Sequence, residues 1–230
     1  AGLVTTYYYL DAFQLEKKYA VEIDNYADQA LLFDPTLAES LIAKALYHMY
    51  KKDFQSAVPY LEKALEYNPN SVTVINFLAD FYCNYLPNTM RYLEYALRGI
   101  RLDITSYDSA TISFNYLRMS NALMQTGFIE EAIMFIDKSL AYNPKNPYSS
   151  YVKAWILFAR DRDFEQAKER LIKELEKDTT RIDILQDVAK ICFLMRDYEE
   201  AYKYYKPFIE FRDRQQLDIY KHEDLRVAIV

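Results

Sequence analysis

Side chains suited to acid-base or nucleophilic chemistry are few in this sequence of 230 residues. It contains two histidines, His48 and His222, and no recognisable motif places a Ser or Cys nucleophile beside either of them. The paired carboxylates Glu130-Glu131 and Glu199-Glu200 lie where two helices are expected to begin, and the helix dipole stabilises acidic groups there. We therefore expect no catalytic residues and predict that the chain is not an enzyme.

Sites for phosphate, metal ions and nucleic acid are also disfavoured. Only 3 Gly leave few positions for the left-handed backbone of a phosphate-binding loop. Cys83 and Cys192 lack metal-ligand spacing, so we expect two buried free thiols in a reducing compartment. The 28 basic and 34 acidic residues give a net charge of -6, which repels the phosphate backbone. We predict no cofactor, no metal and no nucleic-acid partner.

No apolar run approaches the roughly 18 residues that a membrane-spanning helix needs. The first six residues, Ala1 to Thr6, also lack the basic flank of a signal peptide. We therefore expect a cytoplasmic segment with no membrane partner. The first residue is not Met, and the last residues, Leu225 to Val230, are apolar-rich like a helix that is just beginning. From these ends we expect a fragment of a longer protein.

The elements that position any site must come from an internal repeat, which is visible in a recurring dipeptide. Asp34-Pro35, Asn68-Pro69 and Asn143-Pro144 share an Asp or Asn before proline, and 34 residues separate Pro35 from Pro69. Asp103 and Asp178 fill the same position without the proline. Asp or Asn can cap a helix, and proline suits a first helical turn while ending the helix before it. The spacing predicts helical units of about 34 residues.

A second mark recurs inside each unit and predicts a turn between two helices. An Asp or Gly precedes an aromatic residue and, a few positions later, an alanine, at Asp53-Phe54, Gly127-Phe128, Asp163-Phe164 and Asp197-Tyr198. The segments that begin at Asp163 and Asp197 have the form of a capping box. Ala57, Leu61 and Ala64 then follow at the i, i+4, i+7 spacing of a buried helical stripe.

These residues resemble the tetratricopeptide repeat family, whose unit is a helix-turn-helix with small and large apolar residues at fixed positions and a proline near its end. The best match is residues 38–71, where the family positions are filled by Ala45, Ala57, Leu61, Ala64 and Pro69. Ala132, Ile136, Ser139 and Pro144 repeat the last four. By this resemblance His48 belongs to the core. The match is looser at Phe208 and Glu174, where the family has a small residue.

The resemblance implies an all-α fold, an α-solenoid forming a right-handed superhelix of about six helix-turn-helix repeats and a truncated extra helix. We expect a single solenoid over 1–230, with repeats at about 4–35, 38–69, 72–104, 110–144, 147–179 and 182–213 and a further helix beginning at 219–230. Six extra residues, Ile104 to Ser109, lengthen one connection. The first unit has Lys17-Lys18-Tyr19 in place of a capped turn, as is usual for a terminal repeat.

The resemblance also implies a ligand groove lined by the first helix of each repeat. The residues that it places there are Asn76, Asp80, Asn84, Leu117, Asn121, Gln125, Tyr148, Tyr151, Trp155 and Phe158. The amides suit the backbone of an extended peptide, because they both donate and accept. The aromatic stripe from Tyr148 to Phe158 either packs inside the stack or offers an apolar anchor. Ile42 and Leu46 replace the polar residues with which some family members hold a carboxylate tail, so that kind of clamp is not supported.

Three functions remain open at this stage. The favoured one is a non-catalytic scaffold that binds a peptide segment or a partner domain, including other domains of the same polypeptide. Tyr7 to Leu10 and the stretch 96–103 resemble bacterial proteins that join such repeats to a nucleotide cyclase or a DNA-binding regulatory domain. The alternatives are a self-assembling structural protein whose repeat ends stack into a homo-oligomer, and an enzyme whose site has no recognisable motif.

Overall fold

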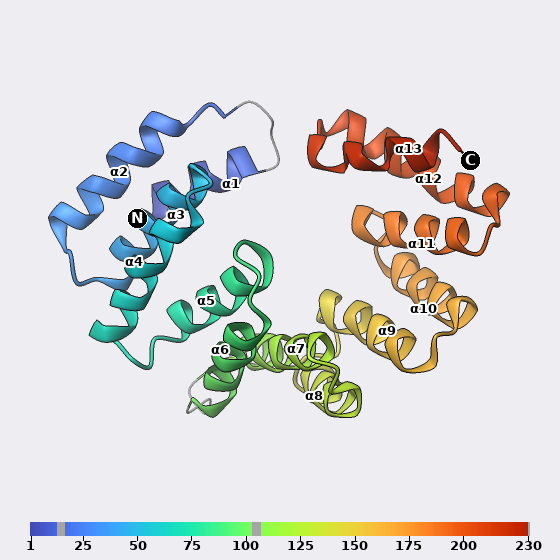
Figure 1. Cartoon of the computed structure of the whole chain (residues 1–230), viewed down its shortest axis with the longest axis horizontal. Helices are drawn as coiled ribbons and strands as arrows, with labels where there is room; N and C mark the ends of the chain where they lie inside the picture. Colours follow the sequence, from blue (N-terminus) through green and yellow to red (C-terminus); the bar gives the residue numbers. More distant parts are fainter. Residues whose placement is uncertain (13–16, 103–106, 230) are drawn as a thin grey trace. The chain divides into compact units, whose positions relative to one another are not determined.

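The computed structural model describes residues 1–12, 17–102 and 107–229, and every regular element in these ranges is a helix (Figure 1). Twelve α-helices form six antiparallel hairpins within this part of the chain, followed by a short helical segment. The predicted all-α fold of about six helix-turn-helix repeats is thus confirmed. Asp103 and the start of the predicted long connection, Ile104 to Ser106, lie outside the described residues.

The helices belong to two compact units, Ala1–Tyr107 and Asp108–Val230, which we call unit 1 and unit 2 and describe separately. Unit 1 contains α1 (Gly2–Ala12), α2 (Ala20–Phe33), α3 (Ala38–Tyr50), α4 (Phe54–Tyr67), α5 (Val72–Asn84) and α6 (Thr89–Arg101). Unit 2 contains α7 (Ser109–Gln125), α8 (Ile129–Tyr142), α9 (Pro147–Asp161), α10 (Phe164–Lys177), α11 (Ile182–Leu194) and α12 (Tyr198–Arg214), then the 3-10 helix η1 (Asp218–Glu223) and α13 (Asp224–Val227).

Aspartate caps begin the second helix of several hairpins, as the sequence predicts. The carboxylates of Asp53, Asp163 and Asp197 accept hydrogen bonds from the backbone amides three residues later, at 3.3, 3.0 and 3.1 Å. Each bond satisfies a donor that has no partner inside the helix. The bond from the Gln166 amide holds the pKa of Asp163 below its usual value. Phe128 occupies the N-cap position of α8 and makes no side-chain cap, so not every second helix is capped in this way.

The turns before these caps use left-handed backbone. Lys52, Gly127, Arg162 and Arg196 have φ angles of 59°, 86°, 57° and 64°. Each lies one or two residues after the first helix of its hairpin, where a left-handed residue lets the backbone bond the last carbonyl groups of that helix. Glycine adopts this conformation without the steric cost of a Cβ, and only one of these four positions has it.

The first hairpin is closed by a cap from a distance. The Asp11 carboxylate, at the end of α1, accepts from the backbone amides of Lys18 and Tyr19 at 2.9 Å each. The same oxygen accepts from the Tyr50 hydroxyl of α3 at 2.8 Å. Asp11 is only 1% exposed, so these donors replace the water that it has lost. One carboxylate thus joins α1, the start of α2 and α3.

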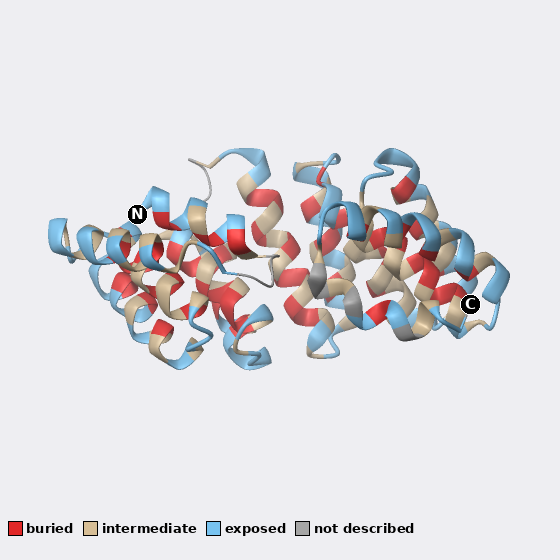
Figure 2. Cartoon of the chain, turned by 90° about the horizontal axis from the view of Figure 1, so that it is seen from above, coloured by how far each residue is buried: buried red, intermediate tan, exposed pale blue. Residues whose placement is uncertain are grey.

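The core of each unit lies between facing helices, and the hairpin turns are exposed (Figure 2). The positions singled out by the repeat pattern are fully buried at Ala45, Ala57, Leu61, Ala64, Ala132, Ile136, Ser139, Ala189, Ala201, Tyr205 and Phe208. The predicted register of the amphipathic helices is therefore confirmed at these residues. In the part of the chain that the structure describes, no helix is long and apolar enough to span a bilayer.

Candidate functional site

The histidines lie in different surroundings. The His48 ring stacks on Tyr60 with centroids 5.3 Å apart, and its Nδ1 lies 3.6 Å from Asp53 Oδ2. Its side chain is 20% exposed, so His48 packs at the edge of the core. His222 is exposed, and its Nε2 lies 3.2 Å from Glu223 Oε1. Both arrangements fit structural roles.

The two thiols differ in burial, which corrects one expectation. Cys192 is fully buried, and desolvation raises its pKa to about 11. Such a thiol is a poor nucleophile at neutral pH. Cys83 is only half-buried, although the sequence analysis expected both to be buried. Cys83 directly follows the buried Tyr82 on α5, and successive side chains of a helix point in different directions, so Cys83 does not share the buried face. No group of three potential metal ligands occurs among the described residues.

Unit 1 has a pocket of about 210 Å³ between the first helices of its three hairpins. α1, α3 and α5 all contribute to its wall, together with the residue after α5: Tyr8, Tyr9, Leu46, Met49, Phe77, Asp80, Phe81, Asn84 and Tyr85. Asp80 and Asn84, two of the predicted groove residues, thus line a real concavity. Asn84 Nδ2 donates to the Asp80 carbonyl at 3.0 Å. The third predicted residue of this helix, Asn76, is half-buried.

The wall of this pocket is largely aromatic. The rings of Tyr8 and Tyr9 meet edge to face at 5.4 Å, and those of Phe81 and Tyr85 stack at 6.1 Å. Burial raises the pKa of both Tyr8 and Tyr9, so their hydroxyls stay protonated and can donate. Sequence reasoning missed these aromatic residues as a site, although Tyr7-Tyr8-Tyr9 stood out. The missing information was that α1 and α5 line the same pocket with α3.

Unit 2 presents its predicted groove residues unevenly. On α7, Gln125 is exposed and Asn121 is half-buried, but Leu117 is only 8% exposed and belongs mainly to the packing. α7 and α9 are in contact, so the amide-bearing helix and the aromatic helix lie side by side within unit 2. That both share one groove with Asn76 to Asn84 of unit 1 stays a prediction.

The aromatic stripe of α9 is part core and part surface. Tyr151, Trp155 and Phe158 are half-buried against the hydrophobic cluster of unit 2, whereas Tyr148 is 48% exposed. Tyr151 Oη and Trp155 Nε1 donate to the same Asp187 oxygen of α11, at 2.6 and 3.1 Å. Desolvation raises the Asp187 pKa more than these two bonds lower it. Only the Tyr148 end of the stripe is therefore freely available to a ligand.

A cation lies against that exposed end. The Arg181 guanidinium lies 5.0 Å from the Tyr148 ring centre and 5.6 Å from that of Tyr151. It also bonds both carboxylate oxygens of Asp183, at 2.8 and 2.6 Å. Asp183 and Asp187 are on the same helix, so Tyr148, Tyr151 and Arg181 form a polar-aromatic surface beside acidic groups. This surface suits both hydrogen bonding and ring stacking.

Comparison with known proteins identifies the repeat. Residues 38–71 match the family model of the tetratricopeptide repeat, the same segment that the sequence pattern favours. This segment of the chain is a tetratricopeptide repeat. The resemblance inferred from Ala45, Ala57, Leu61, Ala64 and Pro69 is confirmed. No curated protein matches the sequence.

Solved structures of tetratricopeptide-repeat proteins share the fold over most of the chain. PilW, a widely conserved type IV pilus biogenesis factor, has a TM-score of 0.70 at 18% identity and covers 100% of both chains. PilF of Pseudomonas aeruginosa has a TM-score of 0.63 at 17% identity, covering 93% of this chain and 96% of its own. YrrB, a tetratricopeptide-repeat protein with an unusual peptide-binding site, has a TM-score of 0.51 at 12% identity, covering 86% and 97%. At these identities the likeness establishes the fold alone.

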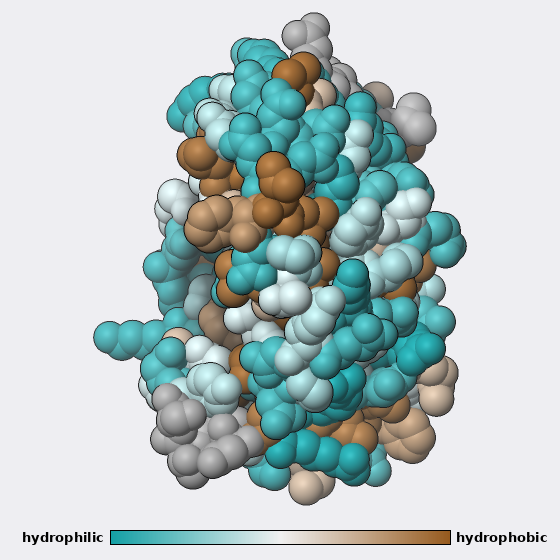
Figure 3. Space-filling model, turned by 90° about the vertical axis from the view of Figure 1, so that its left-hand side faces the viewer, coloured by the Kyte–Doolittle hydropathy of each residue, from teal (hydrophilic) through white to brown (hydrophobic). Residues whose placement is uncertain are grey.

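A different kind of surface occurs on α2. Val21, Leu32 and Phe33 are 69%, 88% and 91% exposed, although all three are apolar. Figure 3 shows unit 1 from the side of α2, where apolar side chains form patches among hydrophilic ones. Single exposed apolar residues are common, but a group on one helix indicates a surface suited to contact with protein.

Proposed function

We propose that the chain is a non-catalytic interaction module that binds an extended segment of a partner protein, or of another domain of its own polypeptide, on the first helices of its repeats. The observation that carries this proposal is the unit 1 pocket, because three consecutive first helices contribute to it. Its volume of about 210 Å³ is below the roughly 300 to 1,000 Å³ of small-molecule sites, so it suits one anchoring side chain of a peptide.

The residue types of the pocket support a peptide ligand. Tyrosine and other aromatic side chains contribute much of the binding energy at protein interfaces, because they bury a large area and retain a polar tip. Asn84 is exposed and offers an amide next to the aromatic wall, where it can bond a peptide backbone. The peptide-binding site of YrrB, a protein of the same fold, is consistent with this use of the repeats.

The test is to select peptides on the full chain by display and to titrate a selected peptide calorimetrically. Tyr9→Ala and Asn84→Ala change exposed positions, so both variants keep the fold. We expect each to weaken binding at least about tenfold, which corresponds to roughly 1.4 kcal/mol. Lys63→Ala on α4, a second helix, is the matched control and leaves the affinity unchanged. Equal affinities for all four proteins would place the ligand elsewhere.

The unit 2 surface is tested with Tyr148→Ala and Asn121→Ala in the same titration. Trp155→Ala is less informative, because its indole bonds Asp187 and contacts Phe158 with centroids 5.7 Å apart. Its loss would change the packing as well as the surface. If the ligand extends along the predicted groove, Tyr148→Ala weakens binding; if it occupies unit 1 alone, only Tyr9→Ala and Asn84→Ala do.

The exposed apolar residues of α2 favour a second candidate function, self-assembly. If copies of the chain stack through this helix, the mass measured by sedimentation rises with concentration, and Phe33→Lys abolishes the rise. Phe33 is 91% exposed, so its replacement leaves the monomer folded. A mass that is constant over a hundredfold concentration range would reject self-assembly and leave peptide binding untouched.

A further inference from the structure

Two adjoining pockets lie on another part of unit 2, between α8, α9 and α10. Their volumes are about 270 and 450 Å³, and both are lined by Ser150 and Glu174. We call them together the basic trough. Neither contains any of the predicted groove residues or any residue of the unit 1 pocket, although Arg181 lies at the border between the trough and the Tyr148 surface.

The trough is positive although the chain as a whole is negative. Its walls carry six cationic side chains and two carboxylates, those of Glu174 and Asp178, whereas the net charge of the chain is -6. The cations are Lys145, Lys153, Arg170, Lys173, Lys177 and Arg181. A concave basic surface on an acidic protein attracts a ligand of opposite charge.

Half of these cations are already paired. Lys153 lies 2.7 Å from Asp137, Lys177 lies 2.6 Å from Glu174, and Arg181 bonds Asp183. The Asp178 carboxylate accepts hydrogen bonds from the backbone amide and the hydroxyl of Thr180, at 3.0 and 2.6 Å. The bond from the hydroxyl lowers the Asp178 pKa. Lys145, Lys173 and Arg170 remain to meet a ligand, and both lysines are exposed.

Arg170 supplies the second observation. Its Nη2 donates to Gln166 Oε1 at 2.7 Å, but its Nη1 is buried and has no hydrogen-bond partner within the described part of the chain. A buried donor without an acceptor costs about 1 to 3 kcal/mol, and more when it is charged. Buried donors in native proteins almost always have an acceptor, which is supplied by the protein, by ordered water or by a bound ligand.

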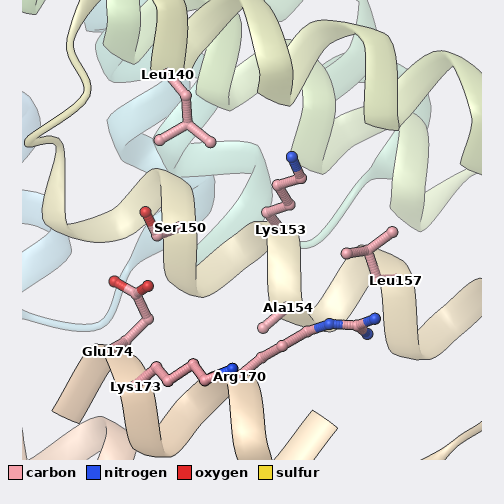
Figure 4. Close-up of a pocket in the computed structure, with 8 residues that line it drawn as sticks. All are labelled: Leu140, Ser150, Lys153, Ala154, Leu157, Arg170, Lys173 and Glu174. Carbon is pink, nitrogen blue, oxygen red and sulfur yellow. The ribbon is translucent and has the colours of Figure 1, made fainter. Parts of the chain in front are cut away.

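Figure 4 shows how the side chains lie in the smaller of the two pockets. Arg170 extends from α10 below α9 toward Leu157, Lys153 points away toward α8, and Glu174 points toward Ser150. Leu140, Ala154 and Leu157 give the pocket apolar walls. The guanidinium thus lies beside an apolar wall, which fits a carboxylate on a short aliphatic stem.

We propose that the basic trough binds an acidic segment of a partner protein, with one Glu or Asp carboxylate accepting from Arg170 and further carboxylates facing Lys145 and Lys173. An acidic peptide matches both features, since its carboxylates are carried on aliphatic stems. The Glu174 carboxylate, which is only 16% exposed, opposes any anion in the trough and limits its affinity. The proposal can therefore be tested by a variant that binds more tightly as well as by variants that bind more weakly.

The probe is a fluorescein-labelled peptide of sequence Glu-Glu-Leu-Glu-Glu-Leu, titrated with the full chain by fluorescence anisotropy at low ionic strength. We expect Arg170→Gln to bind at least about tenfold more weakly, because a charge-assisted hydrogen bond is lost. Lys173→Gln changes an exposed residue and weakens binding several-fold. Glu174→Gln keeps the side-chain volume, removes the opposing charge and binds several-fold more tightly.

Lys203→Gln on α12 is the matched control, because it removes one exposed positive charge from the same unit and leaves the trough intact. It binds the probe like the wild type, and so does Tyr9→Ala, which separates this site from the peptide pocket of unit 1. If Arg170→Gln fails to fold, the proposal is tested by whether Lys173→Gln weakens and Glu174→Gln strengthens binding of the probe.

Four results would overturn the proposal. The first is that the probe does not bind the wild type at low ionic strength, and the second is that a Gln-Gln-Leu-Gln-Gln-Leu peptide binds equally well. The third is that Lys203→Gln weakens binding as much as Arg170→Gln does. The fourth is that inorganic phosphate displaces the probe but chloride at equal ionic strength does not. The last would assign the trough to a simple anion.

Discussion

Ala64→Glu tests the repeat register most directly. Ala64 lies on the buried stripe of α4, is fully enclosed, and occupies a position where the repeat family requires a small residue. A glutamate there must place a carboxyl group among apolar atoms. The equivalent position on α10 is occupied by Glu174, which is 16% exposed and bonds Lys177. The two sites therefore differ in whether the carboxylate can reach water or a cation.

The cost can be worked out from two contributions. Holding the buried carboxyl neutral at pH 7, against an ordinary pKa of about 4.3, costs roughly 3.7 kcal/mol at 1.36 kcal/mol per pH unit. Overpacking adds about 1 to 3 kcal/mol. The sum of roughly 5 to 7 kcal/mol approaches the whole stability of a small domain, about 5 to 15 kcal/mol. At pH 4.3 and below, the protonation cost largely disappears and the overpacking cost remains.

The assay is urea unfolding followed by circular dichroism at pH 7 and at pH 4.5, with Ala64→Gln as the control of nearly equal volume. Because the folded-state pKa of the new glutamate is raised, Ala64→Glu should recover stability relative to Ala64→Gln as the pH falls. Identical midpoints for the two variants at pH 7, or a midpoint equal to that of the wild type, would show that Ala64 does not face the core.

Three further outcomes are expected. Deleting the chain from Ile182 onward leaves unit 1 folded, since repeats contact only their neighbours, and proteolysis with mass spectrometry measures the surviving fragment. Asp187→Asn is expected to be more stable than the wild type at pH 7 and equally stable near pH 4. Because burial raises the Asp187 pKa, the wild type loses stability as this carboxyl ionises with rising pH, and the asparagine does not. Thermal unfolding of both proteins between pH 4 and pH 7 measures the difference. Lys52→Gly stabilises the chain slightly, by up to about 1 kcal/mol in urea unfolding, because φ is 59°, whereas Lys51→Gly, at φ -75°, destabilises it.

The fold follows from local signals in the sequence. The caps at Asp53, Asp163 and Asp197 and the apolar spacing of Ala57 and Leu61 act within a few residues, so pattern alone locates the helices. The repeat period then pairs them. Because the same pattern recurs at nearly constant spacing, each repeat supports the assignment of its neighbour, and the hairpins could be predicted without knowledge of the packing between repeats.

The candidate sites depend on contacts that the pattern does not encode. Asp187 receives hydrogen bonds from Tyr151 and Trp155, which are 36 and 32 residues away, about one repeat. Family positions indicate which residues face the groove. They do not indicate that Asp187, on the next repeat, holds Tyr151 and Trp155 against the core and leaves Tyr148 exposed. The basic trough likewise depends on three helices, although the departure at Glu174 was visible in the sequence.

Three of the 23 tyrosines share one structural role. The hydroxyls of Tyr50, Tyr151 and Tyr205 donate to Asp11, Asp187 and Glu223, at 2.8, 2.6 and 3.3 Å. The first two bonds join helices of neighbouring hairpins, and the third joins α12 to η1. Two of the carboxylates, those of Asp11 and Glu223, are 1% exposed. A tyrosine fills apolar space with its ring and supplies one of the donors that offset the cost of burying the carboxylate.

The exposure of the side chain separates structural tyrosines from tyrosines that can contact a ligand. Burial raises the pKa of Tyr50, Tyr151 and Tyr205, which keeps each hydroxyl protonated and therefore able to donate. Tyr9 and Tyr148, by contrast, are about half exposed, at 56% and 48%. A ring held at the surface beside a pocket or a guanidinium contributes little to the core, so its area remains available to a partner. The exposed tyrosines, rather than the total tyrosine content, are therefore the residues to vary first in any binding assay.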